Sequence, residues 1–354
     1  MKELKLLLYP FSCLYGFISF LRNKAYDWGI LRSYEFPIPI ISLGNLSMGG
    51  TGKTPHIEYL IELLSPENKI ATLSRGYKRL SKGFKIAEKG DTSDSIGDEP
   101  MQFFKKYPEI IVAVDEDRKN GIENLMSQFP EIDLILLDDA FQHRRVKPGL
   151  SILLTDYLQP FYNDYVFPSG TLREFISEKK RADIVVVTKT PKVFSPITTR
   201  TLTEKIKPLP NQAVCFSYIK YSGFVPLTEI ASTLEKTTFN TILVLAGIAN
   251  PYPLEAHLKS FCEEIQPMYF KDHHRYTYED AVRIKESFHN IVTRNKAIFT
   301  TEKDVMRLLN QALFKEIADI PVFYAPIAVD FHDFCKSLFI TQIFDYVKKA
   351  KRSH

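Results

Sequence analysis

The sequence has few of the residues that build disulfide frameworks, zinc sites or nucleic-acid surfaces. Only four cysteines occur in 354 residues. None lies in a C-x-x-C pair or close to a group of histidines, so we expect buried free thiols in a reducing compartment, without disulfides or zinc. The net charge is only +4, which gives no bulk signature of nucleic-acid binding, and we predict no nucleic-acid partner. The hydrophobic share of 45% and the charged share of 25% are those of a folded protein.

The sequence also lacks an apolar run long enough to span a membrane. The segment from Leu6 to Leu21 is uncharged and rich in aromatic residues, but it is shorter than the roughly 20 residues that a spanning helix needs. Pro10 and Gly16 interrupt it, and no small-x-small cleavage site of a signal peptide follows. Two interpretations stay open for this segment alone: a helix lying in the membrane interface, or a helix buried in the core.

A glycine-rich loop follows the first apolar strand. Residues 41–55 read ISLGNLSMGGTGKTP, with Ser47 where the standard phosphate-loop pattern has its first glycine. Glycines let backbone N–H groups turn inward around a polyphosphate, Lys53 can reach the β and γ phosphates, and the Thr54 hydroxyl can ligate Mg²⁺. We therefore predict that a nucleoside triphosphate binds at Ser47, Met48, Gly49, Gly50, Thr51, Gly52, Lys53 and Thr54.

Short apolar runs alternate with polar or amphipathic segments, which is typical of a wound α/β sheet with mostly parallel strands. Prolines cluster after Thr188, and a second set of apolar runs begins at Thr241. We predict a P-loop NTPase-like sheet with a second, smaller α/β domain. The predicted ranges are an N-terminal amphipathic or hydrophobic helix over 1–35, a nucleotide-binding core over 36–212 and the smaller domain over 213–354.

Polar side chains follow several of these runs, where wound sheets bind their ligands. Asp138 and Asp139 end an apolar strand, and either carboxylate fits the magnesium shell of a bound nucleotide. Asp98 follows a glycine turn, where the interpretation as a helix cap is favoured when the motif is taken alone. The pair His273-His274 is, by itself, more often structural than catalytic. Other polar groups near the expected ligand edge are Arg75, Arg118, Gln142, Arg173 and Glu174.

Together these segments resemble the tetraacyldisaccharide 4′-kinases of lipid A synthesis in Gram-negative bacteria. The matching pieces are GNLSMGGTGKTP (44–55), SRGY (74–77), GDEP (97–100), DDAFQHR (138–144), GTLRE (170–174), DHH (272–274) and TTEKD (300–304). The form of the phosphate loop with Ser47 is the family's own, whereas the turn 168–171 is less proline-rich and apolar than expected. The resemblance implies transfer of the γ-phosphate of ATP, with Mg²⁺, to the 4′-hydroxyl of an acylated glucosamine disaccharide 1-phosphate.

The resemblance also implies roles for single residues. Asp98 is expected to act as the general base with His273 as its partner, His274 being less suited. A sugar hydroxyl is a poor nucleophile at neutral pH, so a carboxylate that accepts its proton is chemically sensible. Thr54, Asp138 and Asp139 are the expected metal ligands. Candidates for binding the 1-phosphate or for stabilising charge are Glu99, Arg75, Tyr77, Arg118, Gln142, Arg173 and Glu174.

An acylated substrate must be met at a membrane surface, so the resemblance favours the interfacial interpretation of Leu6 to Leu21. We expect a peripheral protein on the cytoplasmic face of the inner membrane, without an obligate protein partner. The main alternative is a P-loop NTPase that acts as a hydrolysis-driven switch or a metal chaperone. The segment Thr188-Lys189-Thr190-Pro191 lacks the aspartate of a guanine signature, and cysteine or histidine clusters are absent. A third alternative, a nucleotide-regulated membrane adaptor, would leave Asp98 and His273 without a chemical role.

Overall fold

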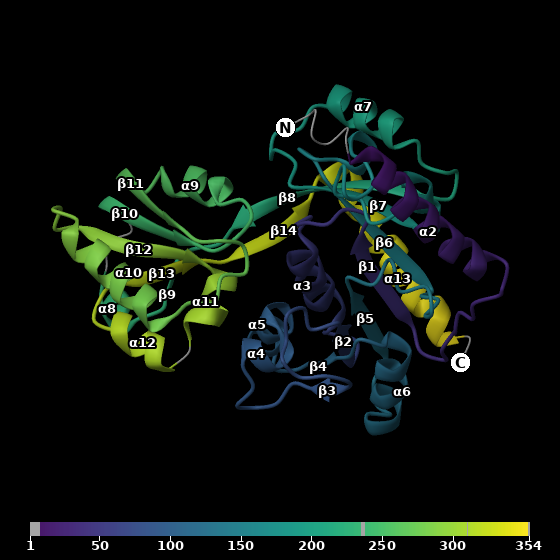
Figure 1. Cartoon of the computed structure of the whole chain (residues 1–354), viewed down its shortest axis with the longest axis horizontal. Coiled ribbons are helices and arrows are strands. Elements are labelled where there is room, and N and C mark those ends of the chain that lie inside the picture. The colour runs from purple at the N-terminus through teal and green to yellow at the C-terminus, as the bar shows by residue number, and fades with distance from the viewer. Residues whose placement is uncertain (1–7, 235–237, 310, 353–354) are drawn as a thin grey trace. The chain divides into compact units, whose positions relative to one another are not determined.

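The computed structural model describes residues 8–234, 238–309 and 311–352 and divides into two compact units (Figure 1). The first unit holds the described residues up to Gly90 together with 103–219 and those from Val329 onward, and the second holds 91–102 and 220–328. The chain crosses between units four times: after Gly90, and within helix α5 (Asp98–Lys106) and strands β8 (Ala213–Tyr221) and β14 (Ile327–Phe331). This division differs from the predicted ranges, because the C-terminal residues return to the first unit and 91–102 join the second.

A nine-stranded sheet forms the centre of the described part of the first unit, in the order β14-β8-β7-β6-β1-β5-β2-β4-β3. Strands β1, β2 and β4 to β8 pair in parallel, and β3 is antiparallel to β4. The predicted fold class is confirmed, because parallel neighbours need the helical crossovers that the alternating pattern indicated. The remaining strands are β1 (Ile40–Asn45), β2 (Ile70–Ser74), β3 (Lys85–Ile86), β4 (Ile111–Val114), β5 (Leu134–Asp138), β6 (Leu150–Asp156) and β7 (Ile184–Thr188).

Helices support the strand that leads into the phosphate loop. Tyr346, on the C-terminal helix α13, donates its hydroxyl to the backbone oxygen of Ile40 (3.1 Å) and accepts from the Ile40 amide (2.9 Å). Its ring lies over Gly149, where an added Cβ would be 2.3 Å from the Tyr346 oxygen. The helices of this unit are α2 (Tyr9–Asp27), α3 (Lys53–Leu64), α6 (Arg118–Gln128), α7 (Pro196–Ile206) and α13 (Asp333–Arg352), with short 3-10 turns at Phe161–Asn163 and Ile176–Arg181.

Helix α2 turns its apolar side outward. Its buried residues are Ser12, Gly16 and Asn23, whose spacing puts them on one face of the helix. The large exposed side chains on α2 include Phe11, Leu14, Phe17, Ile18 and Leu21. Cys13 is also exposed, unlike the buried thiols expected, because it lies on this outer side. Among the described residues, no helix is long and apolar enough to cross a membrane.

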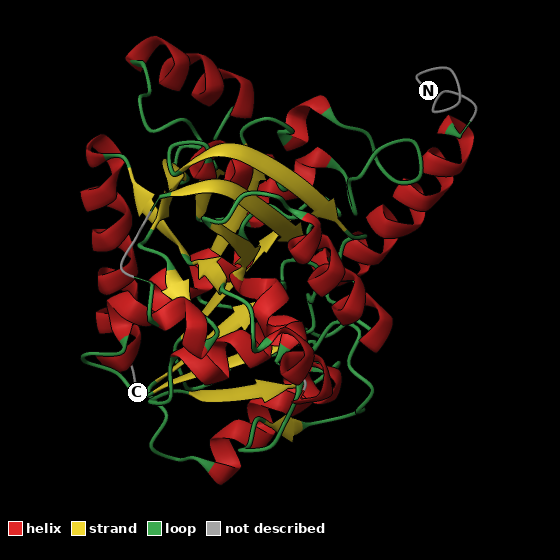
Figure 2. Cartoon of the chain, turned by 90° about the vertical axis from the view of Figure 1, so that its left-hand side faces the viewer, coloured by secondary structure: helices red, strands yellow, loops and turns green. Residues whose placement is uncertain are grey.

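The second unit is built on a five-stranded sheet with helices on both faces. Figure 2 shows the helices of the chain in red and its strands in yellow. Along β10, Ile242 and Val244 pack with α8 and α9, while Leu243 and Leu245 pack with α10, α11 and α12. Strand β11 lies at the sheet edge and was not predicted, because its exposed glutamates break the apolar pattern. The elements are α4 (Ser93–Ile96), β9 (Val225–Pro226), α8 (Glu229–Ser232), β10 (Phe239–Ala246), α9 (Tyr252–Leu258), β11 (Cys262–Tyr269), α10 (Tyr278–Asn290), β12 (Lys296–Thr301), α11 (Glu302–Leu308), α12 (Gln311–Ile317) and β13 (Val322–Ala325).

Candidate active site

The glycine-rich loop joins strand β1 to helix α3. Asn45, which ends β1, donates from its side-chain amide to the backbone oxygen of Gly49 (3.2 Å) and to Thr51 Oγ1 (2.9 Å). Gly52 has φ +87° and makes the turn into α3, a conformation that favours glycine. A Cβ added at Gly49 or Gly50 would meet no neighbouring atom, so the backbone there faces open space. The loop therefore has room for a polyphosphate at the N-terminus of α3.

Lys53 belongs to a charged group with Asp139 and Arg173. The Lys53 ammonium is 3.7 Å from Asp139 Oδ1. Arg173 donates to both oxygens of Asp139, at 2.9 Å to Oδ1 and 3.2 Å to Oδ2. Burial alone would raise the pKa of Asp139, but the charges of Lys53 and Arg173 outweigh burial and lower that pKa. Because both carboxylate oxygens face cations, Asp139 is better suited to positioning Lys53 and Arg173 than to the metal ligation predicted for it.

Gln142 and Glu174 support Arg173 through hydrogen bonds: Gln142 contacts Arg173, and Glu174 contacts Gln142. The Gln142 amide donates to the backbone oxygen of Asn45 (2.8 Å) and to Glu174 Oε1 (2.8 Å), and its oxygen accepts from Arg173 (3.2 Å). Glu174 is 2% exposed and also accepts from Arg181 at 2.7 Å. Glu174, predicted as a substrate or charge-stabilising residue, is therefore enclosed by protein donors in this structure.

Arg118 also lies inside the protein. It is 1% exposed and donates to the backbone oxygens of Asp115 and Asp138. Burial lowers the pKa of its guanidinium to about 10. Arg118 therefore contacts the end of β5 from inside the protein. Arg75 and Tyr77, by contrast, are exposed and stay predictions for substrate contact.

The residues around the loop fit ATP with a magnesium ion. Strands β1 and β5 are parallel neighbours with Leu43 opposite Asp138, so the loop and the Asp138 carboxylate leave the same sheet edge. Protein sites for nucleotide-bound Mg²⁺ supply one or two oxygens and leave the others to phosphates and water. Thr54, in the first turn of α3, and Asp138 are the residues that would hold the ion. No larger cluster of His, Cys, Asp or Glu with metal-ligand geometry occurs in the described ranges, and such a site does not require one.

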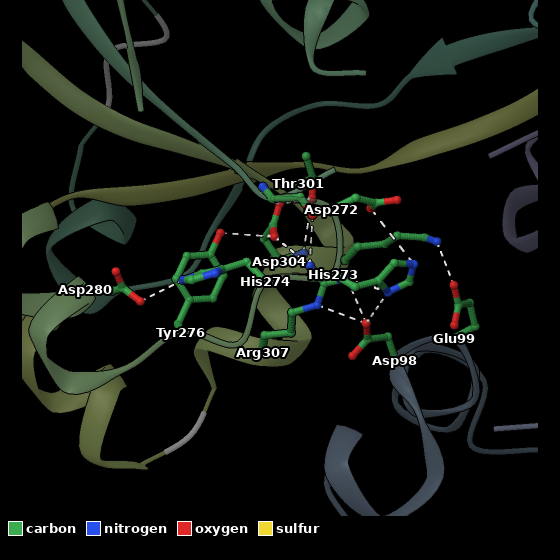
Figure 3. Close-up of polar contacts among 12 residues, drawn as sticks. Asp98, Glu99, Asp272, His273, His274, Tyr276, Asp280, Thr301, Asp304 and Arg307 are labelled. Carbon is green, nitrogen blue, oxygen red and sulfur yellow. Dashed lines mark hydrogen bonds and ion pairs between the residues drawn. The ribbon is translucent and has the colours of Figure 1, made fainter. Parts of the chain in front are cut away.

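A second polar cluster lies within the second unit and is shown in Figure 3. It centres on Asp98, the first residue of α5. Arg307 Nη2 (2.7 Å), Arg307 Nε (2.9 Å) and His273 Nδ1 (3.0 Å) all contact Asp98 Oδ2. Within the part of the chain that the structure describes, Asp98 Oδ1 takes part in none of these contacts. The structure therefore brings Asp98 and His273 together and adds Arg307.

A buried carboxylate fixes Arg307. Asp304 is fully buried and accepts from Arg307 Nη1 (3.1 Å), the Tyr276 hydroxyl (3.1 Å) and the Gly247 amide (3.0 Å). A Cβ at Gly247 would lie 2.9 Å from Asp304 Oδ1, so this approach needs glycine. His273 has φ +58°, and its amide donates to the Gly247 oxygen at 3.1 Å. A non-glycine residue keeps such a backbone only where its surroundings hold it, and the imidazole is oriented by its contact with Asp98.

The cluster keeps Asp98 ionised. Burial alone would raise the pKa of Asp98, but the hydrogen bonds from His273 and Arg307 and the charge of Arg307 outweigh it. The result is a pKa of about 2. Asp98 is therefore a carboxylate at any physiological pH and can accept a proton or a hydrogen bond without first losing a proton.

The adjacent carboxylate, Glu99, pairs with Lys303 at 2.8 Å. Lys303 and Arg307 are four residues apart on α11 and so share one face of that helix. From this face Lys303 contacts Glu99 and Arg307 contacts Asp98. This spacing was present in the sequence, but Arg307 was not predicted as a site residue. His274 contacts Asp280 at 2.7 Å, so in this structure His273 is the histidine that faces Asp98.

Known proteins resemble this chain over almost its whole length. The family model for tetraacyldisaccharide-1-P 4′-kinase matches residues 4–343. A tetraacyldisaccharide 4′-kinase of Bacteroides thetaiotaomicron is 44% identical over 357 residues, covering 98% of this chain and 94% of the relative. One from Flavobacterium psychrophilum is 45% identical over 351 residues, covering 99% and 96%. A solved structure of LpxK from Aquifex aeolicus in complex with ATP has a TM-score of 0.72 at 28% identity, covering 97% of this chain and 99% of that chain.

Proposed function

The chain belongs to the tetraacyldisaccharide-1-P 4′-kinase family, and from this premise we propose that its two polar clusters divide the work of phosphoryl transfer. The protein is an ATP-dependent kinase that phosphorylates the 4′-hydroxyl of tetraacyldisaccharide 1-phosphate in lipid A biosynthesis. The alternative of a hydrolysis-driven switch or chaperone is not favoured by these matches. In our proposal the phosphate loop binds the donor, and the Asp98 cluster receives the proton of the attacking hydroxyl.

The phosphate loop supplies positive charge for the donor. Lys53 and the N-terminus of α3 bind phosphate oxygens, and Arg173, held by Asp139, adds a second cation near Lys53. Phosphoryl transfer spreads negative charge over the equatorial oxygens, so fixed cations lower its barrier. When bound, Mg²⁺ held by Thr54 and Asp138 neutralises phosphate charge. Loss of any one of these cations is expected to slow transfer more than it weakens binding.

Asp98 accepts the proton through its Oδ1 atom. The observation that carries this assignment is the convergence of Arg307 and His273 on Oδ2, which fixes the carboxylate and leaves Oδ1 outside the network. A pKa of about 2 makes Asp98 a weak base. In a loose phosphoryl-transfer transition state the proton leaves late, when the hydroxyl has become acidic, so a weak and well-placed base is sufficient.

Helix α2 is proposed to attach the protein to the cytoplasmic face of the inner membrane. Phe11, Phe17 and Ile18 are each more than half exposed on its outer side, and Arg22 and Lys24 follow the apolar stretch. An apolar face with basic residues at its end is typical of a helix lying in the interface of an anionic membrane. The acylated substrate resides at such a surface, which supports peripheral attachment.

The proposal is tested by following label from γ-labelled ATP into tetraacyldisaccharide 1-phosphate in detergent with Mg²⁺. Wild-type protein should label the lipid, and Asp98→Asn, which keeps the size of the side chain, should lose about 10³-fold in kcat. Nucleotide affinity should persist in Asp98→Asn, since the loop is untouched. ATP consumption without labelled lipid would refute the kinase assignment, and a variant as fast as wild type would refute only the role of Asp98.

A further inference from the structure

One segment, residues 164–175, connects helix α2 to the phosphate loop, and all three belong to the first unit. The segment pairs with the start of the loop through its backbone. The Met48 amide donates to the Thr171 oxygen (2.6 Å), and the Arg173 amide donates to the Leu46 oxygen (2.7 Å). Ser47 and Leu172 form an antiparallel bridge between these two bonds. The segment therefore lies against the start of the phosphate loop. It also places Arg173 in contact with Asp139, the carboxylate that Lys53 contacts.

The same segment is fastened to the inner face of α2. The Ser12 hydroxyl donates to Ser169 Oγ (2.8 Å) and accepts from the Ser169 amide (2.9 Å). Asn23 donates to Glu174 Oε2 at 2.7 Å. All four side chains are at most 4% exposed. Between them, a Cβ at Gly16 would lie 2.6 Å from the Phe175 ring, so α2 approaches the segment as closely as a glycine allows.

The buried charge of Glu174 makes the Asn23 contact energetically important. Its two oxygens face Asn23 on one side and Gln142 and Arg181 on the other. Removing a donor from a buried carboxylate costs more than losing an ordinary hydrogen bond, because the charge is left without compensation. Glu174 must then shift, and Gln142, which bonds both Asn45 and Arg173, shifts with it.

We propose that Ser12 and Asn23 of α2 are positioning residues for the nucleotide site. They hold residues 164–175 so that Arg173 and the start of the phosphate loop are in place before ATP binds. Helix α2 thus serves the nucleotide site through its inner face, whatever its outer face contacts. The inference rests on the proposed function only in taking residues 47–54 as the site of ATP.

The decisive test exchanges the two partners of the buried contact. Asn23→Asp sets two carboxylates against each other, and we expect the dissociation constant for ATP, measured in detergent without lipid substrate, to rise about tenfold. Adding Glu174→Gln to Asn23→Asp restores a donor and an acceptor with their positions exchanged, and should bring ATP affinity back to within about threefold of wild type. Asn124→Asp, a change at a half-buried position on α6, is the matched control for added charge. A folded Asn23→Asp protein with wild-type affinity, or a loss that Glu174→Gln does not reduce, overturns the proposal.

If Asn23→Asp does not fold, two less disruptive variants, Ser12→Ala and Ser19→Ala, test the proposal. Ser12→Ala removes the hydroxyl that bonds Ser169 and should weaken ATP binding about threefold, whereas Ser19→Ala, at a half-buried position on the same helix, should not. Equal affinities for these two variants overturn the proposal. The variant Lys53→Met tests the proposed function separately from the role of Ser12 and Asn23. If Lys53→Met binds ATP as tightly as wild type, residues 47–54 are not the nucleotide site.

Discussion

Asp139 and Asp98 are both carboxylates held by an arginine, yet the arginines hold them differently. Arg173 spans the two oxygens of Asp139, and Lys53 adds a further contact to one of them. Arg307 places two of its three donor nitrogens, Nε and Nη2, on a single oxygen of Asp98, where His273 also converges. Asp139 therefore presents no oxygen without a cation, while Asp98 keeps Oδ1 outside the network. Asp139 and Asp98 thus differ in how the donors are distributed over their two carboxylate oxygens. With donors on both oxygens, Asp139 positions cations, whereas Asp98, with donors on one oxygen, can accept a proton on the other.

The comparison also distinguishes how each arginine affects the chemistry. Arg173 lies beside Lys53, so its charge adds to the field that a bound phosphate experiences. Arg307 is 5% exposed in its side chain and is itself fixed by Asp304, so its charge acts on Asp98. The first arginine is expected to change how the donor is bound and how fast it reacts, and the second to change how readily Asp98 takes a proton.

The largest effect is expected from Lys53→Met. The variant removes the phosphate-loop cation proposed to bind the phosphate oxygens of the donor, so kcat/KM for ATP should fall about 10³-fold. Initial rates of lipid labelling at varied ATP give the value. Lys147→Met, which removes an exposed lysine paired with Glu35, is the matched control and should stay within about twofold of wild type. A loss below about tenfold for Lys53→Met would contradict the role of the loop.

Arg307→Met should reduce kcat by about 10²-fold while leaving the KM for ATP nearly unchanged, because it loosens Asp98 without touching the loop. Arg307→Lys keeps the charge but not the paired donors and should recover part of the loss. A change in the KM for ATP as large as that in kcat would show that Arg307 acts on nucleotide binding instead.

The pH dependence of kcat/KM tests whether Arg307 acts on the ionisation of Asp98. With a pKa lowered to about 2, Asp98 is ionised at all pH values at which the protein is assayed, so it should add no acidic limb to kcat/KM above about pH 5. Burial raises the pKa of Asp98, and in Arg307→Met fewer contacts oppose that effect, so the pKa should rise. As the pH is lowered, the variant should therefore lose activity at a higher pH than wild type does. A wild-type acidic limb between about pH 6 and 7, where imidazoles ordinarily titrate, would assign the proton to a histidine.

The smallest effect concerns the outer face of α2. The double change Phe17→Ser and Ile18→Ser removes two exposed apolar side chains and should weaken partitioning onto phosphatidylglycerol-containing vesicles at least tenfold. Labelling of substrate in those vesicles should fall more than labelling in detergent micelles. Leu80→Ser, an exposed apolar residue outside α2, is the control in a vesicle sedimentation assay. Equal partitioning of the variant and wild type would exclude α2 as the membrane contact.

Features that are contiguous in the chain could be predicted from the sequence. The phosphate loop occupies one short stretch after an apolar strand, and Asp138 ends another strand, so glycine content and apolar runs indicate both. The pairing of Asp98 with His273 came from the resemblance to a family, because no local pattern links residues so distant. Arg307 lies 209 residues from Asp98, and only the face that it shares with Lys303 on α11 hinted at its part.

Tertiary structure decided which polar groups are accessible and which partner each one has. Sequence patterns could not show that Glu174 and Arg118 are buried, because burial of a charge depends on donors and acceptors brought from other segments. They could not show that α2 packs through Ser12, Gly16 and Asn23, since hydrophobic periodicity predicts the opposite face. The sequence by itself determined the apolar strands of the parallel sheet, the loop and the chemical types of the site residues, which are local properties. The assignment of each carboxylate to its cations, and with it the difference between Asp98 and Asp139, arises only when each folded unit brings side chains that are distant in its own part of the sequence into contact.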